Sequence, residues 1–520
     1  MRRARGPGED GRARLWEPAP PDEERAMSTI GAADPEVRVS TGRLRGRVED
    51  GVAVFRGVPF ARPPVGALRL AAPVPAEPWD GVREAGAFGP PPPQSRLLGA
   101  SRADGGDGDW LTLNVWSPDL GTARLPVMVW IHGGGYMYGW SGDPLFDGRV
   151  LARDGVVVVT FNYRVSAEGF GHFQGAPANR GLLDQAAALR WVRGNIAAFG
   201  GDPDRVTVFG ESAGAGSIAA LMAMPAAAGL FRGAIAQSVP GLFFSAELAA
   251  DLGTVVAAEL GLPPHAGELA HLPPERLIDA GDAVSEKMGG CPRWGRAAYA
   301  QTLLGPVVDG EVLPGVPWEA AREVDLIAGH NRDEYRLFMA IRGELGEITA
   351  DRAATALREL APDPEAYRAA YPEAGEERLY ELVHSDWLFR MPSLRLAEAH
   401  QGRAYVYELT WPAPGMGGEI LGACHGLGLP LTFGNLTAGA AGLLLGPEPP
   451  PVAAELSARV RAAWVAFAAT GDPGWPAYEP ETRHTWVVST EPGVTAYPEE
   501  VSRRLWAGHA FGPLTLQPPP

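Results

Sequence analysis

The sequence predicts an α/β fold in which a mostly parallel central sheet carries helices on both faces. Short apolar runs, each suited to one buried strand, recur along the chain, and longer segments with helical periodicity separate them. Parallel strands need a crossover connection, usually a helix, so this alternation indicates a parallel sheet with both faces covered. The apolar runs are residues 125–131, 156–161, 206–209 and 234–238, and the helical segments include residues 184–195 and 215–224.

The two ends of the chain differ from this pattern. Residues 38–40 and 53–55 are short apolar stretches that we expect to open the fold as a hairpin-like pair. Residues 1–36 mix Arg, Pro, Gly and acidic groups without an apolar run, and residues 512–520 are similarly poor in apolar runs, so both are predicted to be disordered tails. Met27 offers an alternative start of translation.

Between these tails the sequence predicts a single catalytic domain over residues 37–511. Near residues 247–288 and 348–400 the pattern becomes helical and is interrupted by proline. We expect these two segments to be helical cap insertions that shape the pocket.

The pentapeptide Gly210-Glu211-Ser212-Ala213-Gly214 stands between an apolar strand and an Ala-rich helix. Strand, G-x-S-x-G, helix is the context in which this pentapeptide forms a nucleophile elbow. The turn holds the serine in a strained conformation with its hydroxyl exposed, and side chains two positions away on either side would collide. Ser212 is therefore the predicted nucleophile.

A glycine-rich segment, His132-Gly133-Gly134-Gly135-Tyr136, follows the apolar run at 125–131. Three glycines after a buried strand leave backbone N–H groups free to approach a substrate oxygen, as in the HGGG-type oxyanion loop. The predicted oxyanion donors are the N–H groups of Gly134, Gly135 and Ala213.

These two motifs and several shorter ones resemble the type-B carboxylesterase (carboxylesterase/cholinesterase) family, most of all the bacterial para-nitrobenzyl esterases. The similarity runs from about residue 37 to about residue 498. It implies the α/β-hydrolase fold and a serine esterase that uses neither cofactor nor metal. The shorter motifs are FRGVPFA at 55–61, LTLNVW at 111–116, NYR at 162–164, NRGLLDQ at 179–185 and FGGDP at 199–203.

The catalytic base is predicted to be His425. In this fold the triad follows the chain order Ser, Asp or Glu, His, so the base comes late in the sequence. Among the late histidines, only His425 lies in a flexible Gly-rich loop, and this loop resembles the family's catalytic histidine segment. The other late histidines are His384, His400, His484 and His509.

The acid is predicted to be Glu334, since an apolar strand at 326–329 delivers it to the carboxyl end of the sheet. The stretch containing it is similar to the family's Asn-x-Asp-Glu segment. Its neighbour Asp333 is the competing candidate, with a helix N-cap as its alternative role. Asp309 is better explained as a turn residue.

Composition excludes several classes of function. A net charge of −17 argues against nucleic acid as a partner. No uncharged apolar run is long enough to cross a membrane, and no signal-peptide pattern is present. We therefore expect a cytoplasmic protein that is a monomer or a weak homo-oligomer, with a small-molecule ester as its partner. Lys287 is the only lysine beside many arginines, a bias that suggests a GC-rich bacterial genome.

The two cysteines, Cys291 and Cys424, are too few for a metal cluster. Many secreted members of the family close an early loop with a disulfide, but the matching positions here are Pro92 and Trp110, which favours a reducing compartment. Cys424 is expected to support the loop of His425 as a small apolar side chain.

Aromatic residues gather near the predicted oxyanion loop and after the run at 234–238. An esterase needs an apolar pocket, so these residues are candidates for its wall, with ordinary core packing as the alternative. The candidates are Tyr136, Tyr138, Trp140, Phe243 and Phe244.

Two positions depart from the family pattern that the resemblance implies. Gly108 stands where relatives often have a glutamate that pairs with the arginine matching Arg56. Gly428 stands where relatives often have an acidic residue near the catalytic histidine. Both changes are expected to affect efficiency rather than the chemistry.

Taken together, the sequence predicts a serine carboxylesterase that acts on esters of small or medium apolar acids through an acyl-enzyme. One alternative is a binding protein of the same fold without catalysis. A second is an amidase, thioesterase or carbamate hydrolase with the same triad, since one acyl-enzyme serves all of them.

Overall fold

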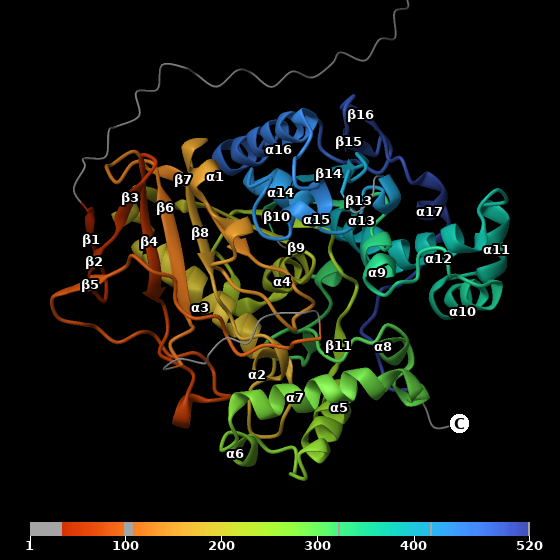
Figure 1. The fold of residues 1–520 in the computed structure, drawn as a ribbon, viewed down its shortest axis with the longest axis horizontal. Helices are drawn as coiled ribbons and strands as arrows, with labels where there is room; N and C mark the ends of the chain where they lie inside the picture. Colours follow the sequence, from red (N-terminus) through yellow and green to blue (C-terminus); the bar gives the residue numbers. More distant parts are fainter. Residues whose placement is uncertain (1–33, 98–107, 321–322, 416–418, 518–520) are drawn as a thin grey trace, which may run out of the picture.

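The main element of the structure is an 11-stranded sheet with the strand order β16-β15-β14-β13-β10-β9-β7-β8-β6-β4-β3 (Figure 1). The computed structural model describes residues 34–97, 108–320, 323–415 and 419–517. The strands are β3 (Arg47–Glu49), β4 (Val52–Pro59), β6 (Thr112–Ser117), β7 (Leu125–Ile131), β8 (Val157–Phe161), β9 (Gly201–Glu211), β10 (Gly233–Gln237), β13 (Asp325–Asn331), β14 (Ala404–Leu409), β15 (His484–Val488) and β16 (Gly493–Ala496).

The central part of this sheet is parallel. Every neighbouring pair from β15 through β14, β13, β10, β9 and β7 to β8 is parallel. The outer pairs, β15 with β16, β8 with β6, β6 with β4 and β4 with β3, are antiparallel. The predicted mostly parallel sheet is confirmed.

Helices cover both faces of the sheet because the side chains of each strand alternate between two cores. In β7, Val127 and Val129 join one core, and Met128 and Trp130 join the other. The first core includes residues of α3 (Arg180–Asn195), α4 (Ala213–Ala223) and α13 (Met391–Ala399). The second includes residues of α1 (Arg149–Arg153), α14 (Gly428–Phe433) and α16 (Pro451–Thr470).

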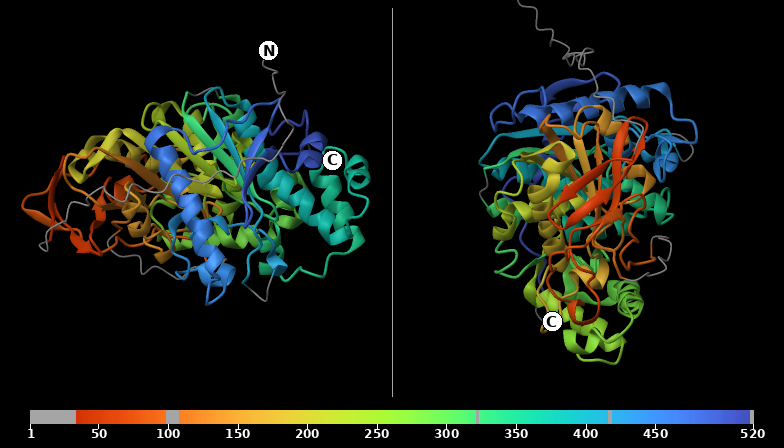
Figure 2. Two further views of the ribbon diagram at one scale, coloured as in Figure 1. Left: turned by 90° about the horizontal axis from the view of Figure 1, so that it is seen from above. Right: turned by 90° about the vertical axis from the view of Figure 1, so that its left-hand side faces the viewer.

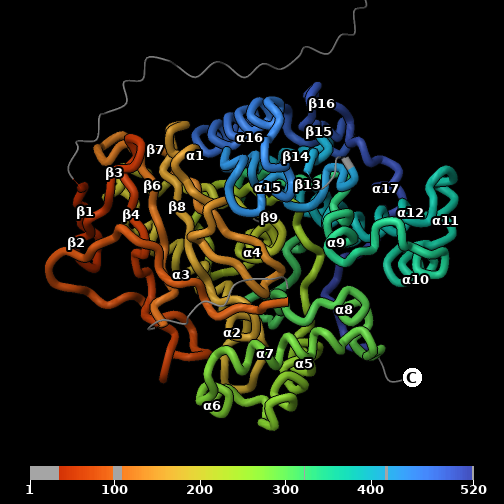
Figure 3. The backbone as a smooth tube through the Cα atoms, viewed as in Figure 1, coloured from red at the N-terminus to blue at the C-terminus, as the bar shows by residue number. Residues whose placement is uncertain are grey.

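Both of the predicted insertions contain helices, and Figures 2 and 3 show that they lie apart from each other. The first comprises α5 (Ala246–Glu259), α6 (Ala266–Leu269) and α7 (Pro274–Lys287). The second comprises α10 (Ala350–Leu360), α11 (Pro364–Ala370) and α12 (Glu376–Ser385), and a π-helical turn, Asp386–Arg390, then leads into α13. Pro274 and Pro364 stand at helix starts, where the missing N–H is harmless.

Smaller elements complete the described chain. Two small sheets accompany the main one: β1 (Glu36–Val39), β2 (Gly42–Arg45) and β5 (Val82–Glu84) form the first, and β11 (Phe244–Ser245) with β12 (Val307–Val308) the second. The remaining α-helices are α2 (Ser166–Phe170), α8 (Gly295–Tyr299), α9 (Arg336–Ile341), α15 (Ala441–Leu445) and α17 (Glu500–Leu505). None of the described helices is both long and apolar enough to cross a membrane.

The predicted pairing of residues 38–40 with 53–55 is wrong. Residues 36–39 pair with Gly42–Arg45 instead, while β4 pairs with β3 and β6 in the main sheet. A tight turn just before Gly42 closes the first hairpin locally, so the first strand never reaches residue 53.

The predicted disordered tail at 512–520 is wrong for the residues that the structure describes, which end at 517. The Leu514 N–H donates to Phe243 O at 2.6 Å, and Ser245 N–H donates to Leu514 O at 2.9 Å. Farther along, Gln517 N–H donates to Arg293 O at 2.8 Å. The segment is ordered because it pairs with a strand edge, which its composition does not reveal. In the predicted N-terminal tail, residues 1–33, with Met27, lie outside the described residues, and Glu36 begins β1.

Candidate active site

The turn at Ser212 has the geometry of a strained elbow. It joins the end of β9 to the start of α4, with backbone angles φ 57° and ψ −125° at Ser212. Such a conformation is costly for a residue with a Cβ and persists only when its surroundings enforce it. Ser212 is only partly buried, unlike Glu211 and Ala213 on either side.

The two glycines of the motif are needed because the carboxyl end of β7 passes directly beside the turn. A Cβ on Gly210 would lie 2.8 Å from the Ile131 carbonyl oxygen, and one on Gly214 would lie 2.0 Å from the same atom. The predicted reason for glycine on both sides of Ser212 is thus found in the packing of β9 and α4 against β7.

Replacing Gly214 with alanine is expected to destabilise the protein strongly. The new methyl group collides with backbone atoms of Ile131 and His132, which cannot rotate away as a side chain would. We expect a loss beyond the about 1–3 kcal/mol of ordinary overpacking, measured by denaturant unfolding.

The matched control for this change is Gly194→Ala in the exposed part of α3, where an added Cβ meets no atom within 4 Å. A gain of about 0.5–1 kcal/mol is expected there, since alanine favours a helix over glycine. Equal stability of Gly214→Ala and the native chain would contradict the packing argument.

The glycine loop after β7 lies against Ser212. A Cβ on Gly133 would lie 3.2 Å from the Cβ of Ser212. Gly134 and Gly135 have φ angles of 108° and 60°, and a Cβ on Gly135 would meet no atom within 4 Å. Within the described chain, the N–H groups of Gly134, Gly135 and Ala213 donate to no acceptor. These donors are therefore available to an oxygen bound next to Ser212.

His425 and Glu334 form a hydrogen-bonded pair. Nδ1 of His425 lies 2.6 Å from Oε2 of Glu334, and the other carboxylate oxygen, Oε1, accepts the N–H of Asn331 at 2.8 Å. The Glu334 side chain is fully buried, and that of His425 is 8% exposed. A carboxylate held in this way selects the imidazole tautomer with its proton on Nδ1 and leaves Nε2 as the acceptor.

The loop of His425 is attached to the loop of Glu334 by further hydrogen bonds. The N–H of Asp333 donates to Ala423 O at 2.9 Å, and the N–H of Ala423 donates to Oδ2 of Asp333 at 3.0 Å. Nδ2 of Asn331 donates to Cys424 O at 2.6 Å. Asp333, the competing acid, thus supports the loop backbone and makes no hydrogen bond with His425. It does not cap α9, whose N-cap is Tyr335.

Nε2 of His425 lies 3.2 Å from Oε1 of Glu211, the residue directly before Ser212. No hydrogen bond joins His425 to the hydroxyl of Ser212 in this conformation. Burial raises the pKa of Glu211 to about 7, and the Glu334 carboxylate adds to the rise while His425 opposes it. Burial alone would lower the pKa of His425, but Glu211 and Glu334 together raise it above its usual value.

Two phenylalanines that the sequence analysis missed pack on the imidazole of His425. The ring of Phe389 stacks at 4.2 Å between centroids, and the ring of Phe338 lies at 5.2 Å. Phe338 lies in α9, four residues after Glu334, a spacing from which it could have been found. Phe389 comes from the π-helical turn, and no local signal relates it to the site.

Three of the five aromatic candidates for the pocket wall are core residues. Tyr136, Phe243 and Phe244 are 2%, 0% and 1% exposed. Tyr136 packs on Phe170, and Phe243 packs edge-on against Trp318. Their prediction as wall residues is wrong because aromatic side chains near a motif also fill the core beneath it.

Tyr138 and Trp140 are partly exposed and remain candidates for the pocket wall. Burial and then the charge of Glu211 raise the pKa of Tyr138. Trp140 is anchored farther out, where its indole N–H donates to Gly89 O at 3.1 Å and its ring contacts Phe88.

The structure supplies another carboxylate for Arg56, whose partner in the family is missing because position 108 is glycine. Arg56 forms a bidentate ion pair with Glu49, including a contact of 2.8 Å between its Nη2 and Oε2 of Glu49. Gly108 has a φ of 79°, and a Cβ there would lie 2.4 Å from Val65. At the second position, a Cβ on Gly428 would meet only Oε1 of Gln237, at 3.8 Å.

The remaining late histidines have other partners or positions. His384 is buried within α12 and stacks on Tyr335, and burial lowers its pKa to about 3. His400 ends α13, and His484 begins β15. His509 packs against Trp506 and Phe511. The two cysteines are free: Cys424 is buried beside His425, and Cys291 is half-buried.

Comparisons with known proteins agree with this arrangement. Residues 33–506 match the model of the carboxylesterase family. The para-nitrobenzyl esterase of Bacillus subtilis (strain 168) is 39% identical over 90% of this chain and 97% of its own length. The phenmedipham hydrolase of Pseudarthrobacter oxydans is 36% identical over 88% of this chain and 95% of its own length.

Solved structures are similar over most of the chain as well. A carboxylesterase from Geobacillus stearothermophilus superposes with a TM-score of 0.80 at 35% identity, covering 91% of this chain and 99% of that protein. Together with the family match, this similarity confirms the predicted α/β-hydrolase fold.

Proposed function

This chain belongs to the carboxylesterase family and is a carboxylic ester hydrolase, and we propose that it hydrolyses esters of small or medium apolar acids with a Ser212–His425–Glu334 triad. The observation that carries this proposal is the 2.6 Å hydrogen bond between His425 and buried Glu334, on a loop beside the strained turn of Ser212. The free N–H groups of Gly134, Gly135 and Ala213 next to Ser212 support it.

In the first half of the reaction, His425 takes the proton of Ser212 while Oγ attacks the carbonyl carbon of the ester. The charge that develops on the carbonyl oxygen is stabilised by the N–H groups of Gly134, Gly135 and Ala213. Glu334 orients the imidazole and stabilises the imidazolium. The imidazolium then protonates the departing alcohol, which leaves an acyl group on Ser212.

In the second half, His425 activates a water molecule that attacks the acyl group. A second tetrahedral intermediate forms in the same oxyanion site, and its collapse releases the acid and restores Ser212. Nε2 of His425 faces Glu211 in this structure, and Ser212 is the next residue along the chain. A reorientation therefore brings Nε2 to Ser212 for the reaction. Catalytic hydrogen bonds commonly form in full only when substrate is bound.

The acid part of the substrate is proposed to be apolar because hydrophobic rings lie around the base. Phe338 and Phe389 pack on His425, and Tyr138 is partly exposed near Glu211. Rings in these positions suit an alkyl or aryl group better than a charged one.

The proposed nucleophile is tested by labelling with an alkyl fluorophosphonate, followed by intact-mass measurement. A single adduct is expected on the native chain and none on Ser212→Ala. Turnover of 4-nitrophenyl butyrate, compared with butyric 4-nitroanilide, separates an esterase from an amidase. A well-folded native chain without an adduct would favour the binding protein of the same fold.

The pH dependence of kcat/KM is expected to follow the titration of His425 coupled to Glu211. The base must be neutral, so activity falls as the pH drops through a pKa raised above the usual histidine value. Because the Glu211 carboxylate contributes to that rise, Glu211→Gln is expected to move the acidic limb of the profile to lower pH. The measurement is kcat/KM from pH 5 to pH 9 for both chains.

A matched control for this profile is Glu259→Gln on the exposed end of α5, which removes one carboxylate far from His425. Its acidic limb is expected to coincide with that of the native chain. If the acidic limb of Glu211→Gln stayed at the native pH or moved to higher pH, Glu211 would not be raising the pKa of His425, and this assignment would be wrong.

A further inference from the structure

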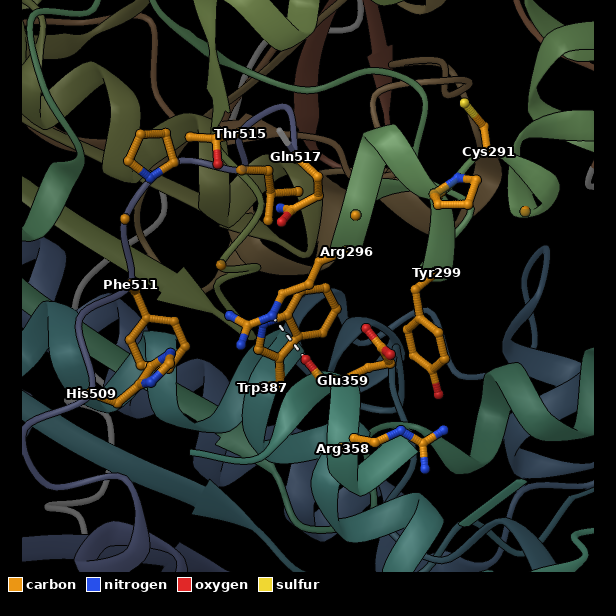
Figure 4. Close-up of a pocket in the computed structure, with 18 of the residues that line it drawn as sticks. Cys291, Arg296, Tyr299, Arg358, Glu359, Trp387, His509, Phe511, Thr515 and Gln517 are labelled. Atoms are coloured by element: carbon orange, nitrogen blue, oxygen red, sulfur yellow. Dashed lines mark hydrogen bonds between the residues drawn. The ribbon is translucent and has the colours of Figure 1, made fainter. Parts of the chain in front are cut away.

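A cavity of about 810 Å³ lies apart from the catalytic loops. It is open to solvent and is lined by residues of α8, the end of α10, the π-helical turn and the C-terminal segment at 509–517 (Figure 4). None of its lining residues belongs to the triad, the oxyanion loop or the aromatic pair on His425.

Arg296 contributes a guanidinium to the lining of this cavity. Its Nε donates to the backbone oxygen of Glu359 at 2.9 Å, which fixes the direction of the side chain (Figure 4). Among the described residues, no carboxylate pairs with its guanidinium, and its two Nη groups have no acceptor. Partial burial lowers the pKa of Arg296, because the charged form loses hydration there; the charge of Glu359 offsets part of that loss, and a bound anion would offset more of it.

Aromatic rings form another part of the lining. Trp387 and Phe511 are 4% and 6% exposed. Phe511 stacks on Trp506 with centroids 5.6 Å apart and ring planes inclined by 11°, and His509 packs edge-on against both rings. These contacts hold the ring of Phe511 in place before any ligand binds, which lowers the entropic cost of binding.

The charges of the lining favour an anion with a single negative charge. Two arginines, Arg296 and Arg358, and one acid, Glu359, line the cavity, so its formal charge is positive in a protein of net charge −17. Burial and the neighbouring Arg296 lower the pKa of His509, so the imidazole is neutral near pH 7 and adds no second cation. One guanidinium suits a carboxylate, whereas a phosphate dianion requires more donors.

We propose that this cavity is a binding site for an aromatic carboxylate, with the carboxylate on Arg296 and the ring system against Trp387 and Phe511. Gln517 and Tyr299 also line the cavity and offer polar groups to the edge of the ligand. Trp387 shares its π-helical turn with Phe389, so the site is built on the same turn that supports the imidazole of His425.

Titration calorimetry with 2-naphthoate tests the site, using the full chain with Ser212→Ala so that binding is measured without turnover. A dissociation constant below about 1 mM is expected for a ligand of this size. Arg296→Gln in the same background should weaken binding at least about tenfold, because a charge-assisted pair is lost. The uncharged 2-naphthylmethanol should bind the parent chain correspondingly more weakly.

Two further variants test whether 2-naphthoate binds in this cavity. Arg368→Gln removes an exposed guanidinium outside the cavity, paired with Glu376, and should leave the affinity unchanged. Gly290→Trp adds a large side chain to the lining at a position where a Cβ meets no atom within 4 Å, and it should abolish binding without altering the melting temperature. The proposal would be overturned if 2-naphthoate did not bind. It would also be overturned if 2-naphthoate bound but neither Arg296→Gln nor Gly290→Trp weakened the binding, since the ligand would then lie in the catalytic cleft.

Discussion

Replacing Ser212 with alanine is expected to lower kcat for 4-nitrophenyl butyrate about 10⁶-fold, the scale seen when a serine hydrolase loses its nucleophile. Without Oγ no acyl-enzyme forms, so the two-step route is lost and only direct attack by water remains. The oxyanion donors at Gly134, Gly135 and Ala213 are left in place, so a residual rate above that in water is expected. The measurement is steady-state hydrolysis at pH 8, with KM expected to change little.

The control for this loss is Ser217→Ala, one turn farther along α4. Ser217 is buried, and its hydroxyl accepts a hydrogen bond from Nε2 of Gln185 at 3.0 Å, away from the exposed turn. Its variant is expected to lose stability and to keep kcat within about tenfold of the native value, since no transition-state contact is removed. A Ser212→Ala chain with near-native turnover would rule out Ser212 as the nucleophile.

Replacing His425 with alanine is expected to reduce kcat by about the same factor of 10⁶, because serine and base act as a unit. Without Nε2 the hydroxyl of Ser212 keeps its proton during attack, and the departing alcohol receives none. The double variant Ser212→Ala with His425→Ala should be no slower than either single variant. This non-additivity is the measurement that distinguishes a shared catalytic step from two independent structural losses.

His484→Ala is the matched control. His484 begins β15 and is partly exposed, and its removal should leave kcat unchanged. If His425→Ala retained most of the activity, or if the double variant lost the product of the two single factors, the triad would be wrong.

Much of the candidate site could be predicted because its elements are encoded locally. The strand at 125–131 and the glycines that follow it are adjacent in sequence, as are the strand, turn and helix around Ser212. A backbone that must approach another chain segment within about 3 Å requires glycine, and the glycine can be recognised in the amino-acid sequence. Chain order together with the family resemblance predicts the pair of Glu334 and His425.

The predictions that are wrong, and the contacts that were missed, depend on which distant segments of the chain meet. Phe243 and Phe244 were expected to line the pocket, but Trp318 and the segment around Leu514 cover them. The same segment was expected to be disordered, because pairing with an existing strand edge leaves no periodic signal. Phe389 reaches His425 only through the π-helical turn, and Arg56 forms an ion pair with Glu49, a partner that the sequence analysis did not predict when it noted the glycine at position 108.

By itself, the sequence determined the α/β alternation, the elbow at Ser212 and the oxyanion glycines, since each depends on residues close together in the chain. The tertiary structure alone decided which aromatic rings surround His425, that Nε2 faces Glu211, and that Arg296 projects into a cavity without a carboxylate partner in the described chain. These features depend on which distant segments meet. Many sequences with the same local pattern bury different side chains at the same places, because packing is governed by shape and volume and not by periodicity.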